Sequence, residues 1–594
     1  MKHQCSSVVF RRMRWMALAV LAVAMTMTLT ACDVTPERTD SASPDWSRGI
    51  KIGEAALDNP IAIISDSQGR RHLAWVGLSD NRRVLRYAQV DSQANVLLER
   101  ALDIPLHQPQ DARFLFDAQG GLHLFFLAKF ETWDEWVLFH TRLGAQGELL
   151  STPRLLSLPQ EVAQYHQEAL NPQGQIEVFW SREMETGIYH LRLSATGEVL
   201  LPNSVLVPQA ARPAVVADQA GTLHLAWLRT PEPIHQSLVA KEMNYAVFQP
   251  ATRTLVNKTT VALLEIPPGV VIEGPSIALD NSYTYVLWVQ DKRGGKGATG
   301  ADGYYVAFPT GSPAAQMTPL RFYIPASAST TYQARQDGFA YRHLVTLPQR
   351  GLSTDYLVAL RPLAGQQPEL VTVFVLRLTA KQRGFTQLGS AVLTRGQLVG
   401  YQLINDTLNL SLAPALAVGP ANDLSLAWLE FLSEGRYEVR YASTAPAVRQ
   451  KFSALTSKDI ASKGLGLLWY DISYIGFLPM AIAWNLLPFL GMVLYTIFRS
   501  DVTLDNRQAR IALLLVILVQ VAAKVFVLWS FLGAGESLLR AGLFFLPTVL
   551  AAGAMALYWR SPYRRSPFVS FIIFALVDAF LTIFLAFPIV MAQG

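Results

Sequence analysis

Apolar residues gather at both ends of this 594-residue chain, whereas its middle alternates short apolar and polar stretches. Four long apolar runs follow one another near the C-terminus, at 475–498, 511–532, 538–558 and 567–590. Each run is about long enough to cross a hydrocarbon layer of ~30 Å as a helix. The pattern therefore predicts an α-helical transmembrane domain of four helices over residues 475–594.

A ten-residue pattern repeats through the middle of the chain, and its copies end in Trp or Phe. The first copy, "DSQGRRHLAW" at residues 66–75, places an acid, a glycine, a histidine and a tryptophan three residues apart. The positions that the copies share are Asp66, Gly69, His72 and Trp75; Asp117, Gly120, His123 and Phe126; Asp218, Gly221, His224 and Trp227; Gly174 and Trp180; Asp280 and Trp288; and Trp428. Six copies of one pattern indicate an architecture of repeated units.

Each copy predicts a β-hairpin, because Asp accepts backbone N–H bonds at the start of a turn and Gly supplies the positive φ that closes it. Further strands rich in β-branched and aromatic residues follow the hairpins. The first five aromatic positions are 47 to 61 residues apart, the size of a four-stranded propeller blade with long outer loops. The predicted fold of residues 48–445 is therefore an all-β propeller.

The number of blades depends on the interval of 140 positions from Trp288 to Trp428, which holds no clear copy. The segments "FAYRHLVTL", "DYLVALRPL" and "TVFVLRL" in this interval predict strands of one degenerate unit. Seven blades are therefore favoured, with six and eight as the alternatives.

The repeated residues indicate scaffold and not chemistry. A catalytic constellation occurs once in a fold, whereas His72, His123 and His224 recur with the blades. Other copies hold Glu177 and Ser425 at the histidine position without loss of the pattern. We interpret these histidines as buried residues that need a hydrogen-bond partner, either the turn acid or the backbone of a neighbouring blade. The Trp and Phe positions are expected to pack between blades.

The repeat resembles those of bacterial extracytoplasmic β-propeller proteins, including the broad sialidase-like type, over roughly residues 48–445. The resemblance implies a fold and no particular activity, because the sialidase Asp-box S-x-D-x-G-x-T-W differs from this pattern. No arginine triad can be assigned by motif. Phe322-Tyr323-Ile324-Pro325 has Tyr where the sialidase motif Phe-Arg-Ile-Pro has Arg, and it lies far too late in the chain.

The first 31 residues have the three parts of a secretory signal peptide, namely a basic start, the apolar run 16–29 and a small-residue cleavage site. Leu29-Thr30-Ala31-Cys32 resembles the bacterial lipobox, which implies that Cys32 is lipidated and begins the mature chain. Residues 32–47 are polar and rich in Ser, Thr, Pro and Asp, and they predict a flexible tether. Residues 446–474 are expected to link the propeller to the helices.

Basic residues predict how the helices cross the membrane. The loops after the first and third apolar runs carry Arg499, Arg507 and Arg510, and Arg560, Arg564 and Arg565. The loop "GAGES" and the tail "MAQG" carry no basic residue, so the positive-inside rule places the arginine-bearing loops in the cytoplasm and both termini outside. A helical bundle with a lipidated N-terminus predicts the bacterial cytoplasmic membrane, with the propeller on its extracytoplasmic side.

Charge and motifs exclude several classes of function. Removal of residues 1–31 takes away four positive charges and no acid, which lowers the formal net charge from +5 to +1 and argues against a nucleic-acid partner. No P-loop, Rossmann glycine pattern, H-E-x-x-H, C-x-x-C or G-x-S-x-G motif is present. We expect no cofactor and no metal. The expected partners are the lipid bilayer and a protein at the propeller rim or in the membrane.

Three polar residues interrupt the predicted transmembrane helices near mid-membrane. Lys524 lies on the second helix and Asp578 on the fourth, which run in the same direction, and Gln520 lies one turn from Lys524 on the same face. An ionisable residue at this depth is a functional hypothesis by default. One ionisable pair without further acids provides few groups for a proton or ion path. A structural ion pair is therefore favoured over transport or coupling.

The predicted function is that of a binding, sensing or scaffolding subunit of a membrane protein complex, and not that of an enzyme. A propeller offers a broad rigid rim, and anchoring at both ends keeps that rim near one membrane surface. The first alternative is an exo-acting glycosidase-like enzyme with channel carboxylates about 5 to 10 Å apart. The second is a transporter or channel accessory subunit that uses the Lys524–Asp578 pair.

We predict that Cys32 is lipidated, because it follows a basic and apolar leader at the cleavage position. Mass spectrometry of the mature N-terminus should show a diacylated Cys32 and no residues 1–31. Cys32→Ala should keep the leader, since the lipoprotein peptidase acts on the modified thiol. An intact leader or an unmodified Cys32 in the natural chain contradicts the prediction.

Overall fold

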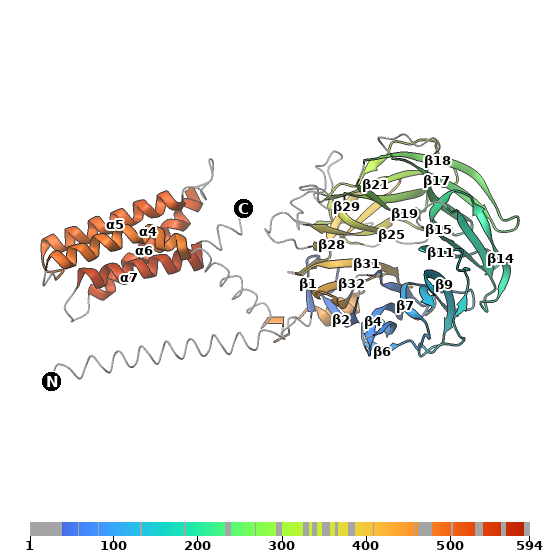
Figure 1. The fold of residues 1–594 in the computed structure, drawn as a ribbon, viewed down its shortest axis with the longest axis horizontal. Coiled ribbons are helices and arrows are strands. Elements are labelled where there is room, and N and C mark those ends of the chain that lie inside the picture. Colours follow the sequence, from blue (N-terminus) through green and yellow to red (C-terminus); the bar gives the residue numbers. More distant parts are fainter. Residues whose placement is uncertain are drawn as a thin grey trace. The chain divides into compact units, whose positions relative to one another are not determined.

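The computed structural model describes residues 38–586 with internal gaps, and the chain divides into two compact units. One unit spans Glu37–Leu455 and consists mainly of β-strands, and the helices of the other follow Thr456 (Figure 1). The predicted signal peptide and Cys32 lie outside the described residues. The residues outside the description are 1–37, 57–58, 81, 131–132, 183–185, 232–238, 268, 293–299, 325–331, 336–340, 347–356, 363–365, 378–385, 408, 455, 458, 461–477, 500–502, 529–537, 560–565 and 587–594.

The β unit is a propeller of seven sheets, and the first four blades hold four consecutive antiparallel strands each (Figure 1). Blade 1 holds β3 (Ala62–Ser65), β4 (Arg71–Ser79), β5 (Arg82–Val90) and β6 (Val96–Ala101), and blade 2 holds β7 (His107–Phe116), β8 (Leu122–Phe130), β9 (Trp133–Leu143) and β10 (Arg154–Leu155). Blade 3 holds β11 (Tyr165–Leu170), β12 (Ile176–Ser181), β13 (Ile188–Leu193) and β14 (Val199–Val207), and blade 4 holds β15 (Ala210–Ala217), β16 (Leu223–Arg229), β17 (Val239–Gln249) and β18 (Thr254–Ile266).

The last three blades contain added strands. Blade 5 holds β19 (Val270–Asp280), β20 (Tyr283–Lys292), β21 (Gly300–Pro309), β22 (Leu320–Arg321) and β26 (Gln366–Gln367). Blade 6 holds β23 (Gln333–Ala334), β24 (His343–Thr346), β25 (Leu357–Pro362), β27 (Leu370–Arg377), β28 (Thr386–Thr394) and β29 (Gln397–Leu403). Blade 7 holds β1 (Arg38–Ser41), β2 (Gly49–Ala55), β30 (Asn405–Asp406), β31 (Ser411–Val418), β32 (Leu424–Ser433) and β33 (Arg436–Ser443).

The favoured number of seven blades is confirmed, and blade 6 is the degenerate unit. The three segments that predicted its strands contribute β24, β25 and β27 to one sheet. Phe374 in β27 takes the place of the aromatic residue, and Val371 stands where other copies have histidine. The copy was not recognisable because blade 6 has neither the tryptophan nor the turn histidine.

The inner hairpins close as the repeat predicts. Asp66 Oδ1 accepts hydrogen bonds from the backbone N–H groups of Gln68 and Arg70 at 2.9 and 2.8 Å, and Gly69 has a φ of 78°. In blade 7 Asn422 replaces the glycine with a φ of 59°. Asn tolerates this left-handed conformation better than most residues, so the turn survives the change.

The repeated aromatic residues fill the spaces between blades. Trp75 packs with residues of blade 7, Trp180 with blade 2, Trp227 with blade 3 and Trp288 with blade 4, and all four side chains are buried. Each ring thus packs against the preceding blade. Full burial of such a ring stabilises the fold by a few kcal/mol.

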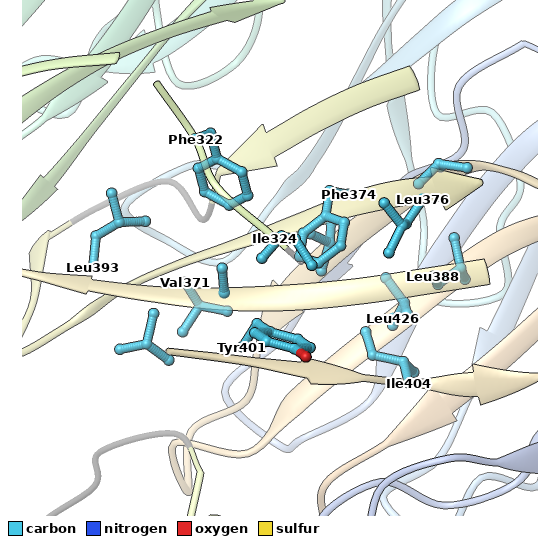
Figure 2. Close-up of a cluster of buried hydrophobic side chains, with 14 of the residues drawn as sticks. Phe322, Ile324, Val371, Phe374, Leu376, Leu388, Leu393, Tyr401, Ile404 and Leu426 are labelled. Carbon is cyan, nitrogen blue, oxygen red and sulfur yellow. The ribbon is translucent and has the colours of Figure 1, made fainter. Parts of the chain in front are cut away.

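Blades 5, 6 and 7 share the largest buried cluster (Figure 2). Phe374 of blade 6 and Leu426 of blade 7 belong to it, together with Phe322 and Ile324. Phe322 and Ile324 are fully buried here. The stretch that distantly matched the sialidase motif therefore supplies core packing.

The strand β2, from the N-terminal part of the chain, closes the ring. The strand β2 pairs with β33 at the outer side of blade 7, with Ile50 opposite Tyr441 and Ala55 opposite Tyr437. Blade 7 is therefore built from both ends of the propeller sequence. After β33, the short helix α2 (Pro446–Phe452) buries Val448 and Phe452 in the cluster shared by blades 7 and 1.

The predicted tether and linker are too long, because parts of both belong to the propeller. Residues 38–41 form β1, and Ser43, Asp45 and Trp46 are buried. The Asp45 carboxylate accepts hydrogen bonds from the backbone N–H of His343 at 2.8 Å and from the side-chain amide of Gln402 at 2.7 Å. These polar residues are buried because blade 6 satisfies their hydrogen bonds.

The helical unit has the four expected helices in the expected order. They are α4 (Leu478–Phe498), α5 (Arg507–Leu528), α6 (Leu538–Trp559) and α7 (Pro567–Leu581), and a π-helical turn η4 (Thr582–Ala586) follows α7. Three described segments are long and apolar enough to cross a membrane, at Pro479–Phe498, Arg507–Val527 and Pro567–Phe584. The apolar segment described in α6 is shorter, Phe545–Trp559.

Candidate functional site

A chain of polar side chains follows the inner hairpin in blade 1. His72 Nδ1 lies 2.6 Å from the Tyr87 hydroxyl, and His72 Nε2 lies 3.5 Å from Asp66 Oδ2. Tyr87 is on β5, so the histidine connects the turn acid with the third strand of the blade. We call such a set of turn acid, central residue and third-strand ring a turn triad.

Turn triads recur around the ring. His123 lies 3.2 Å from Asp117 and 2.8 Å from His140, and His224 lies 3.4 Å from Asp218 and 2.7 Å from Tyr245. In blades with other central residues the same positions still meet: Glu177 with Asn171 and His190, Tyr285 with Asp280, and Ser425 with Tyr441. The complete set occurs in blades 1 to 4, with Asn171 in place of the acid in blade 3, and parts of it occur in blades 5 and 7. It connects strands within each blade and is not a single reaction centre.

Burial keeps most of these imidazoles neutral. It lowers the pKa values of His72, His123 and His224, although each turn acid opposes the shift. It lowers the pKa of His140 to about 3. The neutral rings act as hydrogen-bonded packing groups at physiological pH.

The third-strand rings fit against glycines of the next blade. A Cβ atom at Gly147 would overlap the ring of Tyr87, and one at Gly197 would overlap the ring of His140. These glycines also have positive φ values of 68° and 86°. Tyr and His therefore occupy equivalent places in blades 1 and 2.

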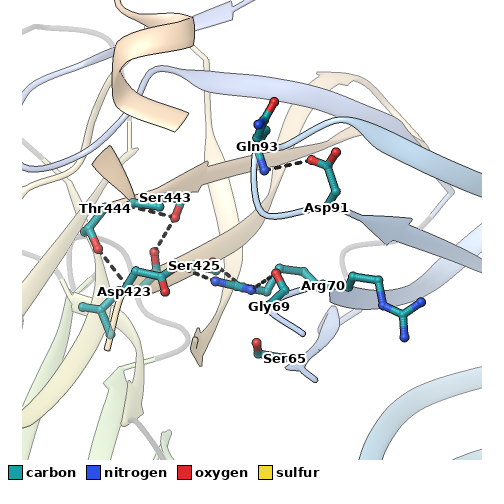
Figure 3. Close-up of polar contacts among 12 residues, drawn as sticks. Ser65, Gly69, Arg70, Asp91, Gln93, Asp423, Ser425, Ser443 and Thr444 are labelled. Carbon is teal, nitrogen blue, oxygen red and sulfur yellow. Dashed lines mark hydrogen bonds and ion pairs between the residues drawn. The ribbon is translucent and has the colours of Figure 1, made fainter. Parts of the chain in front are cut away.

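Polar contacts also join blade 1 to blade 7, where the ring closes (Figure 3). The buried Arg71 donates from Nε to Ser425 Oγ at 2.8 Å, and its guanidinium also pairs with Asp423 and with the Gly69 carbonyl. The turn of blade 1 and the turn of blade 7 are thus connected by one side chain.

A different cluster occurs once, on the innermost strands of blades 2, 3 and 4. These strands, β7, β11 and β15, border the central channel of the propeller. We call the residues that contact one another there the inner-strand cluster: Asp111, Arg113, Tyr165, His166, Gln167, Glu168 and Arg212.

His166 is the buried centre of this cluster. Its Nδ1 lies 2.5 Å from Glu168 Oε1, and its Nε2 lies 2.9 Å from the Asp111 carbonyl and 3.5 Å from the Asp111 carboxylate. Burial alone would lower the pKa of His166, but Glu168 and Asp111 together raise it above its usual value. A positively charged His166 therefore fixes two carboxylates between blades 2 and 3.

Two arginines flank this centre. Arg113 Nη1 and Nη2 lie 2.7 and 3.1 Å from the side-chain oxygen of Gln167, in the orientation of the amide that satisfies both groups. The Arg212 guanidinium lies over the Tyr165 ring, 4.7 Å from its centroid. The φ of Arg212 is 56°, at a bulge in β15 that turns this side chain away from the regular strand pattern. Arg113, Gln167, Tyr165 and Arg212 are all partly exposed.

The inner-strand cluster was not predicted from the sequence. The available signal was the presence of charged residues in strands whose counterparts β3 (AIIS) and β31 (SLAPALAV) contain none. The partners come from three blades, and repeat spacing does not show which inner-strand residues meet.

The membrane polar residues predicted from sequence lie together in the helical unit. Lys524 Nζ donates to Asp578 Oδ1 at 2.7 Å, and Gln520 Nε2 donates to Asp578 Oδ2 at 2.8 Å. Two threonines that the sequence analysis did not single out complete the set: Lys524 Nζ lies 3.1 Å from Thr548 Oγ1 and 2.7 Å from Thr582 Oγ1. We call these five residues the membrane cluster.

The described residues contain no group of three or more His, Cys, Asp or Glu side chains arranged to hold a metal ion. The inner-strand cluster and the membrane cluster are the two candidate sites considered for function.

Comparison with known proteins gives similarities of fold. No family model matches the sequence, and no curated protein matches it. Among solved structures, a PL25 ulvan lyase bound to -[GlcA(1-4)Rha3S]- is 11% identical over 65% of this chain and 95% of that chain, with a TM-score of 0.41. The α-L-arabinofuranosidase Arb93A of Fusarium graminearum is 9% identical over 68% and 97%, with a TM-score of 0.36. The N10 neuraminidase-like protein of A/little yellow-shouldered bat/Guatemala/060/2010 is 11% identical over 57% and 95%, with a TM-score of 0.32. Similarity at this level transfers no chemistry.

We predict that His140→Tyr makes the propeller less sensitive to acid, since blades 1 and 4 hold Tyr at the equivalent position. The native state excludes the proton that unfolded His140 binds, so this residue lowers stability as pH falls below about 6.5. At pH 5 its cost is on the order of 2 kcal/mol.

Urea unfolding at pH 7 and pH 5 measures this effect. His140→Tyr should lose about 2 kcal/mol less than the natural chain between the two pH values, with similar stability at pH 7. An equal loss in both proteins would show that His140 is not held neutral.

Proposed function

We propose that this protein is a membrane-anchored, extracytoplasmic binding subunit whose propeller takes an acid-bearing carbohydrate at the inner-strand cluster. The carrying observation is that this cluster occurs once, on three adjacent blades, whereas the turn triads recur around the ring. In a propeller of similar blades, specific binding of one ligand needs a place where the blades differ from one another.

The chemistry of the exposed side chains supports this ligand class. The positive charges of Arg113 and Arg212 suit a carboxylate or sulfate group. Both Nη atoms of Arg113 also contact Gln167, and Arg212 Nη1 also donates to the Ile272 carbonyl. The Gln167 amide and the Asp111 carboxylate suit sugar hydroxyl groups, and the Tyr165 ring offers an apolar face.

The buried residues of the cluster support binding more than catalysis. The side chain of His166 is fully buried and engaged on both nitrogens, so it positions its neighbours. An exo-acting glycosidase remains the alternative for this site, with Asp111 as the accessible carboxylate. Its side chain keeps 21% of its exposure.

The lipobox-like stretch and the apolar runs of the sequence support anchoring at both ends of the chain. Acylated Cys32 and the C-terminal helices hold the propeller at the outer face of the bacterial cytoplasmic membrane, with both chain termini outside. The apolar segments of the helical unit support membrane association. A binding surface at that place suits contact with extracytoplasmic glycans or with a partner protein that carries them.

We predict that the detergent-solubilised chain binds acidic oligosaccharides and not their neutral counterparts. Arg113→Met and Arg212→Met should each weaken binding by about tenfold or more, the usual effect of losing a charge-assisted hydrogen bond. Arg83→Met removes the same charge from an exposed position on β5 and is the matched control.

Binding is measured on an array that pairs each acidic oligosaccharide with a neutral one, and thermal unfolding checks that the variants fold. Binding that is equal for both ligand classes, or that falls as much in Arg83→Met, contradicts the proposal. Shortened products after incubation would assign the site to the enzyme alternative.

A further inference from the structure

The membrane cluster surrounds the ammonium group of Lys524 with oxygen atoms. Asp578 Oδ1, Thr582 Oγ1 and Thr548 Oγ1 lie 2.7, 2.7 and 3.1 Å from Nζ. An ammonium group has three N–H donors, so these three oxygens satisfy it fully. Carboxylate and hydroxyl oxygens are also ligands that hard metal cations take. The ammonium thus occupies the position that a cation would take in an oxygen cage.

A fourth oxygen lies in this cluster without a partner. Gln520 is fully buried, and its Nε2 is used by Asp578 Oδ2. Among the described residues its Oε1 has no hydrogen-bond partner. A buried acceptor without a donor costs free energy, and a cation in the cage would supply what Oε1 lacks.

Features that interrupt regular helix hydrogen bonding lie at two of the cage residues. Thr548 follows Pro547, which stands inside α6 and offers no backbone N–H to the preceding turn. Thr582 begins the π-helical turn Thr582–Ala586, and its side chain also bonds to the Asp578 carbonyl at 2.6 Å. Helix interruptions of this kind concentrate at functional sites, and in membrane proteins they mark cation and substrate sites.

We infer that the membrane cluster is a monovalent-cation site that the Lys524 ammonium and a free cation such as sodium occupy in turn. When sodium enters, one N–H bond of the ammonium breaks and its proton passes to water. The amine keeps the bonding electron pair and turns away on its flexible stem. Sodium then takes Asp578, Thr548, Thr582 and Gln520 Oε1 as ligands. One positive charge replaces another, so the buried carboxylate stays neutralised.

Among the described residues, Asp578 is the ionisable side chain that contacts Lys524. The other ionisable side chains in the sequence of the four helices are Arg507 and Arg510 near the start of α5, Arg540 near the start of α6, Tyr495 in α4 and Tyr558 near the end of α6. The exchange is therefore between one proton and one cation at a single carboxylate. It does not depend on the ligand of the propeller.

The experiment measures sodium binding to the full chain in mild detergent, by uptake of radioactive sodium and by thermal unfolding. In the natural protein each bound sodium displaces one proton, so its apparent affinity should rise about tenfold per pH unit between pH 7 and 9. In Lys524→Met the cage has no ammonium, so sodium should bind more tightly and without this pH dependence. Sodium chloride should also raise the melting temperature of this variant more than N-methylglucamine chloride of equal ionic strength.

The matched control is Lys524→Met combined with Asp578→Asn, which removes the carboxylate as well and should abolish both sodium effects. An equal melting temperature of Lys524→Met in the two salts overturns the inference. Saturable sodium uptake that persists in the double variant also overturns it. If Lys524→Met does not fold, the natural chain decides. A sodium affinity that is absent or unchanged between pH 7 and 9 then overturns it.

Discussion

The pairing of β2 with β33 is the interaction on which the propeller depends. Without it the outer side of blade 7 would expose unpaired backbone groups, and the first and last blades would lose the backbone pairing that joins them. Arg71 adds a second connection across the same junction through Ser425 and Asp423 (Figure 3). The inner strands of adjacent blades also meet, and side chains from β7, β11 and β15 form one cluster.

The repeat made most of the propeller predictable from sequence, because each hairpin carries its own turn acid, glycine and buried aromatic residue. Blade 6 was found only as weak strands, since Val371 and Phe374 replace the diagnostic residues. The segment 38–47 was mistaken for a tether, since its short polar residues are typical of one. Asp45 shows why composition misled: its carboxylate is buried and satisfied by groups nearly 300 or more positions away.

The two candidate sites differ in how much of each could be predicted from the sequence. Lys524 and Asp578 stood out as charges in apolar runs, and the structure places them in contact. Thr548 and Thr582 could not be singled out, because threonine is unremarkable in a membrane helix. His166 and Arg212 were missed because their contacts depend on register between blades. The repeated turn triads thus belong to the scaffold, and chemistry is proposed at two polar clusters that each occur once.

The most direct test of this account is a disulfide across the closing pair of strands. Ala55 and Tyr437 are opposite each other in β2 and β33, so Ala55→Cys with Tyr437→Cys should form an intramolecular bond on oxidation. The bond closes a very long loop, and the oxidised protein should be more stable than the reduced one by about 3 kcal/mol or more. Ala55→Cys alone controls for pairing with the natural cysteines. Thiols that stay free in the folded double variant, or oxidation that leaves its stability unchanged, would contradict closure through β2.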